Sequence, residues 1–241
     1  MTLKRLKGLD KFRGILPLPF LIIAFFYMRD KFVLGSMTIE RLVDLAGLIS
    51  ILMGEAIRAV AIAAGSRGVR NGNEETKTRR LLVSGVYAYT RNPRYLGNFF
   101  ICLGFAAVFS NLYLAVVSVL GFWLITYAVV ASEEKFLSKT FEAEYDKYRE
   151  TVPRFFLSFK SNQYKAIPWE KWSWKRFFRK EQNTYSTVLL LWCACELVKE
   201  IKIKGAFDVW FYLIGIFSAC IIVQWFILTK WKKGWLDSGN G

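Results

Sequence analysis

The sequence of 241 residues contains no histidine, and this absence removes many common sites from consideration. Without an imidazole there is no histidine general base, and a metal site would need carboxylate or thiolate ligands. Only four cysteines are present, and all lie in apolar runs: Cys102, Cys193, Cys195 and Cys220. The closest two are two residues apart, which places them on different faces of a helix. We therefore expect neither a disulfide framework nor a bound metal.

Acidic residues are also scarce, with 19 Asp and Glu against 34 Lys and Arg, so the formal charge is +15. In a soluble protein this balance would favour a nucleic-acid partner. Here 54% of the residues are hydrophobic. Basic residues of an apolar chain are more simply explained as inside-facing loops beside anionic lipid head groups. We therefore expect membrane lipids as partners and no nucleic acid, whereas the sequence leaves the oligomeric state open.

Six apolar segments are candidate membrane spans, because a hydrocarbon core of about 30 Å needs about 20 helical residues. They run over about 14–28, 39–64, 96–109, 112–131, 185–198 and 209–229. The first holds Pro17 and Pro19 and would have an irregular start. The break at Ser110-Asn111 predicts a tight helical hairpin. These segments predict an all-α fold, a polytopic transmembrane helical bundle of about five to six spans with cytoplasmic loops.

Most Lys and Arg residues fall in the N-terminal segment, the 65–95 loop, the 132–184 region and the C-terminus. If the spans alternate, these four segments lie on the same side. The positive-inside rule then predicts a multi-pass protein with both termini in the cytoplasm. A bacterial plasma membrane and the endoplasmic reticulum both remain open, because no retention or lipidation signal is present.

The stretch Leu81–Asn98, LLVSGVYAYTRNPRYLGN, concentrates unusual residues between two apolar segments. It predicts a turn at Ser84-Gly85, a break at Asn92-Pro93 and then a helix that enters the membrane. Pro93 suits the first turn of a helix, and Asn92 is a good cap before it. The free N–H groups of such a helix start favour an anion. Glu55 and Arg58, in the span before this stretch, predict either a structural pair within one helix or a role near a binding site.

A second group of residues follows the hairpin at spacings of three and four, which predicts one face of one helix ending at Pro153. Its members are Glu134, Leu137, Phe141, Tyr145, Tyr148 and Val152. Because this group and the Leu81–Asn98 stretch flank one hairpin, they lie on the same side of the membrane. A single site could therefore combine them.

The two groups together resemble the integral-membrane methyltransferases related to isoprenylcysteine carboxyl methyltransferase and the phospholipid methyltransferases. The first block reads G-x-Y-x-x-x-R-N-P-x-Y-x-G from Gly85 to Gly97, and the second reads E-E-x-x-L, then F-x-x-x-Y-x-x-Y-x-x-x-V-P-R-F, from Glu133 to Phe155. The resemblance covers roughly 55–155. We divide the single membrane domain (1–241) into N-terminal spans (1–64), a methyltransferase core (65–160), and an interfacial segment with C-terminal spans (161–241).

The resemblance implies a site for S-adenosyl-L-methionine, formed by loops and a helix at the cytoplasmic face, and a lipophilic methyl acceptor. The cofactor-binding residues it implies are Val83, Gly85, Tyr87, Arg91, Asn92, Pro93, Tyr95, Gly97, Glu133 and Glu134. Tyrosines would supply ring faces and hydroxyls, Gly85 and Gly97 would let backbone approach the ligand, and Arg91 would grip a carboxylate. Glu133 or Glu134 would bind an ammonium or ribose hydroxyls.

The residues expected to take part in catalysis are Arg91, Glu134 and Arg154, with Arg154 orienting the acceptor. The family often has histidine where this chain has Asn92, which forms hydrogen bonds but cannot act as a base. A carboxylate acceptor, such as that of a prenylcysteine, needs no base. A lipid amine must first lose a proton, which Glu134 would have to accept.

Two other classes of function remain open. The end of the second block is also similar to the C-terminal part of sterol reductases, which implies an NADPH-dependent membrane reductase. A membrane scaffold that retains the fold without catalysis is the third possibility.

Overall fold

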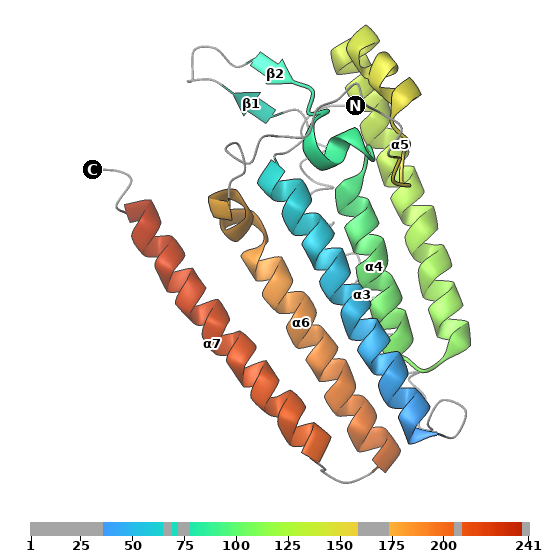
Figure 1. The fold of residues 1–241 in the computed structure, drawn as a ribbon, viewed down its shortest axis with the longest axis vertical. Helices are drawn as coiled ribbons and strands as arrows, with labels where there is room; N and C mark the ends of the chain where they lie inside the picture. The colour runs from blue at the N-terminus through green and yellow to red at the C-terminus, as the bar shows by residue number, and fades with distance from the viewer. Residues whose placement is uncertain (1–35, 65–68, 72–77, 159–173, 205–208, 238–241) are drawn as a thin grey trace. The chain divides into compact units, whose positions relative to one another are not determined.

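The computed structural model describes residues 36–64, 69–71, 78–158, 174–204 and 209–237 of the chain (Figure 1). The described elements are α3 (Met37–Ala64), β1 (Val69–Asn71), β2 (Thr78–Arg80), a 3-10 turn (Gly85–Ala88), α4 (Pro93–Val108), α5 (Leu112–Thr151), α6 (Trp174–Lys204) and α7 (Val209–Asp237). The two strands pair antiparallel, with Arg70 opposite Arg79. The predicted all-helical fold is thus confirmed, with one minimal hairpin added. The candidate span at 14–28 lies outside the described residues.

The chain divides into two compact units, which we describe separately. The first unit comprises Met1–Leu48, Leu103–Val119 and Gln182–Gly241, and the second comprises Ile49–Cys102 and Leu120–Glu181. Helices α3 to α6 each contribute residues to both units. Both sequence blocks fall within the second unit.

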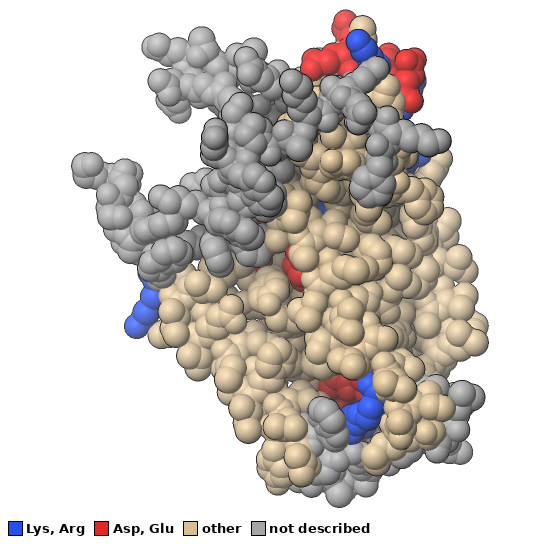
Figure 2. Space-filling view, viewed as in Figure 1, with Lys and Arg blue, Asp and Glu red and all other residues tan. Residues whose placement is uncertain are grey.

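Three of the described helices are long and apolar enough to cross a membrane: Met37–Ala63, Leu112–Thr151 and Phe211–Lys230. Many apolar side chains on these helices are exposed, among them Leu45, Leu124 and Ile216. On the face drawn in Figure 2, charged atoms occupy only small parts of the described surface. The chain is therefore a membrane protein. The crossings predicted for α4 and α6 stay predictions.

The helix starts follow local chemistry. Ser36 lies before α3, and its Oγ accepts a hydrogen bond from the Ile39 N–H at 3.5 Å. Asn111 Oδ1 caps α5 by accepting from the N–H groups of Tyr113 and Leu114 at 3.1 and 3.3 Å. The preceding Ser110 has φ 50°, a left-handed conformation that closes the turn from α4. The predicted break at Ser110-Asn111 is confirmed.

Two helix predictions need correction. The helix predicted from Glu134 to Pro153 is interrupted at Glu142, where φ is 42° and ψ is −121°, although its stripe is buried as expected. Side-chain periodicity survives one distorted residue, so the sequence pattern does not reveal the break. Helix α6 begins at Trp174, well before the predicted 185. The intervening Lys, Arg, Glu and Gln residues are good helix formers that an apolarity criterion overlooks.

Small residues hold α3 and α4 close together within each unit. In the second unit, a Cβ added to Gly54 would lie 2.5 Å from the Gly97 carbonyl oxygen, and one added to Gly97 would lie 2.6 Å from the Gly54 carbonyl oxygen. In the first unit, a Cβ at Gly47 would lie 2.9 Å from the Gly104 oxygen. The glycines recur seven residues apart on each helix, so they face the same neighbour.

Replacing Gly97 with alanine should therefore destabilise the protein. The added methyl group would meet backbone and the Cγ of Arg58 at 2.7 Å, neither of which can easily move. We expect the free energy of unfolding to fall by about 1–3 kcal/mol, measured by thermal or denaturant unfolding in detergent. Gly215→Ala on α7 is the matched control, because a Cβ there meets nothing within 4 Å. Equal stability of the two variants would contradict the close crossing.

Candidate active site

Glu134, on α5, is the residue at which the two sequence blocks meet. Its carboxylate accepts from Arg91 Nε at 3.1 Å, from Asn92 Nδ2 at 3.3 Å and from Arg154 Nε at 2.9 Å. Arg154 Nη2 makes a further contact at 2.7 Å. Glu134 is only 5% exposed and Arg91 6%. The predicted combination of the two blocks in one place is therefore present in the second unit.

Backbone hydrogen bonds tie the same two blocks together. The Arg91 N–H donates to the Pro153 carbonyl at 2.9 Å, and the Ser158 N–H donates to the Tyr89 carbonyl at 2.9 Å. The Tyr148 hydroxyl donates to the Tyr87 carbonyl at 2.7 Å. These bonds hold the 3-10 turn and the start of α4 against the end of α5, so the side chains around Glu134 rest on a fixed framework.

A hydrophobic cluster supports that framework from one side. It consists of Leu81, Leu137, Tyr145, Tyr148 and Val152, with Val83 and Phe141 packed against it. The rings of Tyr145 and Tyr148 meet edge to face at 6.1 Å. Val83, which the resemblance placed at the cofactor, therefore also packs against the core.

Arg91 and Arg154 differ in how much of the guanidinium group remains available to a ligand. Arg91 donates to Glu134 through Nε and Nη2 and to the Arg149 carbonyl through Nη1 at 2.7 Å. All three nitrogens of its guanidinium thus donate hydrogen bonds within the protein. The Arg154 side chain is 30% exposed, and its guanidinium lies 5.1 Å from the centre of the Tyr127 ring. Arg154 is therefore the better placed of the two to contact a ligand.

The charge of Arg154 is secured by its surroundings. Partial burial acts to lower the pKa of this guanidinium, but the hydrogen bond and the charge of Glu134 outweigh it and raise the pKa above its usual value. Arg154 therefore carries its positive charge at physiological pH.

The sequence predicted that the Asn92 side chain caps α4, but in the structure it does not. Its backbone carbonyl accepts the first helical bonds, from the N–H groups of Tyr95 and Leu96. The side-chain amide turns toward the site instead and donates to Glu134 and, at 2.9 Å, to the Arg154 carbonyl. These two acceptors fix the orientation of the amide. Its Oδ1 is buried, and no hydrogen-bond donor among the described residues reaches it.

The two glycines of the first block have different structural requirements. Gly85 has φ 66°, a conformation that suits glycine at the start of the 3-10 turn. Gly97 is required at the crossing with Gly54, as described above. Close approach to a ligand, the reason predicted from the sequence, is therefore not needed to explain either glycine.

The remaining residues predicted for the site also fall within the second unit. Pro93 begins α4 and is buried, and Tyr87 is buried in the 3-10 turn. Tyr89, Tyr95 and Glu133 are half-buried, so part of each side chain can meet a ligand.

A second charged group, on α3, α4 and α6, lies in the second unit. Arg58 donates to Asn98 Oδ1 and to Glu181 Oε2, and Arg94 Nη2 lies 3.5 Å from Glu181 Oε1. Glu55 Oε2 lies 3.8 Å from Arg58 Nε. Sequence reasoning recognised the Glu55–Arg58 pair but missed Glu181, whose only signal is an acidic residue at the end of a basic, aromatic segment.

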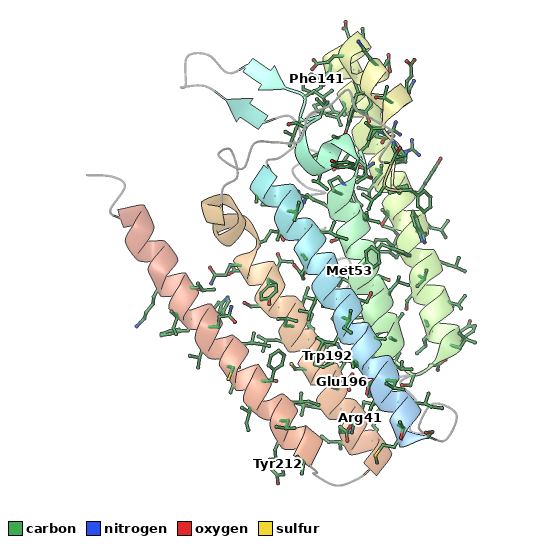
Figure 3. All side chains as sticks on the ribbon, viewed as in Figure 1. Arg41, Met53, Phe141, Trp192, Glu196 and Tyr212 are labelled. Carbon is green, nitrogen blue, oxygen red and sulfur yellow. The ribbon has the colours of Figure 1, made fainter. Side chains whose placement is uncertain are left out.

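The first unit contains a separate buried ion cluster that sequence reasoning missed. Lys199 is 1% exposed and contacts Glu40 at 3.2 Å, Glu196 at 3.1 Å and Asp44. Arg41 pairs with Glu200 beside it. Figure 3 labels Arg41 and Glu196 near one end of α3 and of α6. Lys199 lies just beyond the candidate span predicted to end at 198, whereas the structure buries it within α6, because three carboxylates compensate its charge.

No group of three or more Cys, Asp or Glu side chains suited to a metal ion occurs among the described residues. The carboxylates that do gather, around Lys199, are occupied by that lysine.

The residues that match known proteins overlap the part of the chain that holds most of the site. Residues 43–144 match the family described as phospholipid methyltransferase. The protein-S-isoprenylcysteine O-methyltransferase of Rattus norvegicus is 33% identical over 110 residues, which cover 45% of this chain and 39% of that protein. The Homo sapiens protein of the same name is 30% identical over 112 residues, 46% of this chain and 39% of its own length.

A bacterial relative carries a different name. The nickel-cobalt-cadmium resistance protein NccN of Alcaligenes xylosoxydans xylosoxydans is 36% identical over 80 residues, 33% of this chain and 37% of that protein. No solved structure matches the chain. The match spans well under half the length of each of these three relatives.

The family match contains the whole first block and both glutamates of the second block, and it ends before Arg154. The segment that carries most of this site is therefore similar to phospholipid methyltransferases and to protein-S-isoprenylcysteine O-methyltransferases.

Proposed function

We propose that this protein transfers a methyl group from S-adenosyl-L-methionine to a lipophilic acceptor at the cytoplasmic face of its membrane. One observation carries the proposal: Arg91 and Asn92 of the first block and Arg154 of the second all bind the same buried carboxylate, Glu134. Buried charges that converge in this way within a membrane protein mark a functional site by default.

The residues present fit this cofactor. The donor's ammonium and ribose hydroxyls need hydrogen-bond acceptors, and Asn92 Oδ1 is a buried acceptor without a donor among the described residues. Glu133 is a second, half-buried acceptor. The cofactor's carboxylate needs a cation, which Arg154 can supply because its side chain is partly exposed. Tyr89 and Tyr95 can offer ring faces. When bound, the cofactor would supply an electrophilic methyl group on a sulfonium.

Glu134 positions the cations and is poorly suited to act as a base. Two guanidinium groups and one amide already donate to its carboxylate oxygens. Its contribution is to hold Arg154 in one orientation toward the ligand and to keep Arg91 buried. Alignment of donor and acceptor with exclusion of water is the main requirement of a direct methyl transfer. The buried framework around Glu134 meets that requirement.

The cytoplasmic location and the lipophilic acceptor rest on physical arguments. The basic loops favour the cytoplasmic side for both sequence blocks. The exposed apolar surface of the helices that carry the site indicates that an acceptor would enter from the bilayer. The family's two names point to prenylated carboxylates and lipid head groups as the acceptor classes.

Ligand-dependent thermal stability of the purified protein tests this function. S-adenosylmethionine and S-adenosylhomocysteine, each at 100 times its dissociation constant, should add about 2.7 kcal/mol to the free energy of unfolding. Arg154→Ala should abolish the shift. Arg149→Ala is the control, because the Arg149 side chain is 55% exposed and pairs at the surface with Asp146.

NADPH, measured in parallel, separates the alternatives. Stabilisation by NADPH alone would replace this function with the reductase. If none of the three ligands stabilises the protein, a non-catalytic membrane scaffold becomes the better explanation.

A further inference from the structure

Glu55 is a buried carboxylate that the site described above does not use. It lies on α3 and is 2% exposed. The preceding residue, Gly54, approaches the backbone of Gly97 on α4. Glu55 therefore lies level with the second turn of α4. Neither of its carboxylate oxygens receives a hydrogen bond from any described residue.

The two neighbouring cations, Arg58 and Arg94, both pair with another carboxylate, that of Glu181. Arg58 gives both terminal nitrogens to Asn98 and Glu181, and only its Nε lies near Glu55, at 3.8 Å. Arg94 also points to Glu181. Among the described residues, Glu55 is thus left with a single distant ion pair. A buried carboxylate without hydrogen-bond donors is costly, and within a membrane segment such a group usually has a function.

We propose that Glu55 binds the nitrogen of an amine-headed lipophilic acceptor and takes up its proton during methyl transfer. The proposal rests on the proposed function and specifies its acceptor as an amine rather than a carboxylate. An ammonium group offers the N–H donors that Glu55 lacks, whereas a carboxylate acceptor would add a second uncompensated negative charge beside it. Arg94, whose side chain is 43% exposed, marks the side from which a head group could arrive.

The different hydrogen bonding of the two buried glutamates, Glu134 and Glu55, supports this assignment. Glu134 is held by two guanidinium groups and an amide, so its lone pairs are occupied. Within the part of the chain that the structure describes, Glu55 accepts no hydrogen bond and has one cation nearby, Arg58. A carboxylate that accepts a proton must offer a free oxygen to the N–H group. Of these two residues, only Glu55 does so.

The step balances in atoms and charge. An N–H bond of the acceptor's ammonium breaks, and its proton forms an O–H bond on Glu55. The nitrogen lone pair released in this way bonds to the methyl carbon, whose bond to sulfur breaks. The sulfonium charge is lost as a neutral thioether leaves, and the product is the methylated ammonium.

Three probes with the same tail test the proposal: hexadecylamine, hexadecanoate and hexadecyltrimethylammonium, each incorporated in phosphatidylcholine nanodiscs that hold the full chain. S-adenosylmethionine with an isotope-labelled methyl group is added, and mass spectrometry detects the label. We expect label on hexadecylamine only. Glu55→Gln should lower the rate at neutral pH by about 100-fold or more, the usual contribution of a proton acceptor.

Raising the pH distinguishes proton transfer from a structural role. Above about pH 10 much of the free amine is deprotonated in solution, so Glu55→Gln should regain most of its lost rate relative to the unchanged protein. Glu196→Gln is the control, since Glu196 is equally buried but is paired with Lys199 in the first unit. It should match the unchanged protein at both pH values.

Binding of S-adenosylhomocysteine separates the failure of this proposal from that of the proposed function. If the ligand stabilises both the unchanged protein and Glu55→Gln, but label goes to hexadecanoate or to no probe, the assignment of Glu55 and of an amine acceptor is overturned and the methyltransferase stands. A Glu55→Gln rate that stays normal at neutral pH, or stays low at high pH, also overturns it. If the ligand does not stabilise the unchanged protein, both proposals fail.

Discussion

Glu134→Ala should lower the free energy of unfolding by about 3–5 kcal/mol and abolish binding of S-adenosylhomocysteine. The change leaves Arg91 buried at 6% exposure with an unpaired guanidinium, and removal of one partner of a buried ion pair has a cost of this size. It also releases Arg154 from the carboxylate that orients it. Denaturant unfolding and ligand-dependent melting in detergent would measure the two effects.

Glu133→Ala is the matched control, because Glu133 is the adjacent residue and is half-buried. It should lose much less stability. A double variant, Arg91→Met with Glu134→Leu, should recover part of the lost stability, because it removes both charges of the buried pair. It should still fail to bind the ligand, since Arg154 would remain without its partner. Normal ligand binding by the double variant would show that Glu134 serves folding alone.

Lys199→Met should produce a comparable loss of stability through a different cluster. Three carboxylates contact the Lys199 ammonium within the first unit, and all three are buried. Without that cation their mutual repulsion is uncompensated in an apolar setting. We expect the free energy of unfolding to fall by about 3–5 kcal/mol. Lys199→Arg keeps the charge and should lose less, which keeps the test informative if Lys199→Met does not fold.

Lys202→Met on the same helix is the control for loss of a lysine, because Lys202 is exposed. Thermal unfolding of the three variants in one detergent gives the comparison. Ligand binding by folded Lys199→Arg should be unchanged, since this cluster contains none of the residues around Glu134. Equal stability of Lys199→Met and Lys202→Met would show that the buried ion cluster does not hold α3 and α6 together.

The helices that frame the site could be predicted because their signals are local. Apolar length, Asn92-Pro93 and Ser110-Asn111 mark where α4 and α5 begin or end, and the stripe from Leu137 to Val152 marks a buried face. The meeting of the two blocks could also be expected, since a short hairpin returns the chain to the same side of the membrane. These inferences need only periodicity, turn chemistry and the thickness of a bilayer.

What the pattern could not assign is the role of each charged residue within the site. Arg91 and Arg154 are chemically identical, and only the tertiary structure shows that one is buried against the Arg149 carbonyl while the other reaches the surface. Gly97 lies in the motif, yet its requirement comes from Gly54 on another helix. Such roles depend on the distance between segments far apart in the sequence, which side-chain spacing does not encode.

The sequence by itself determined that this chain is an apolar, helical membrane protein, and which two blocks meet at the candidate site, because composition and spacing are properties of the chain alone. The tertiary structure decided which carboxylates are paired. Glu134 receives three side chains, Lys199 draws three carboxylates, and Glu55 receives no hydrogen bond from the described residues. The physical reason is that pairing of buried charges depends on how helices cross, and a crossing is set by packing between residues that no local pattern connects.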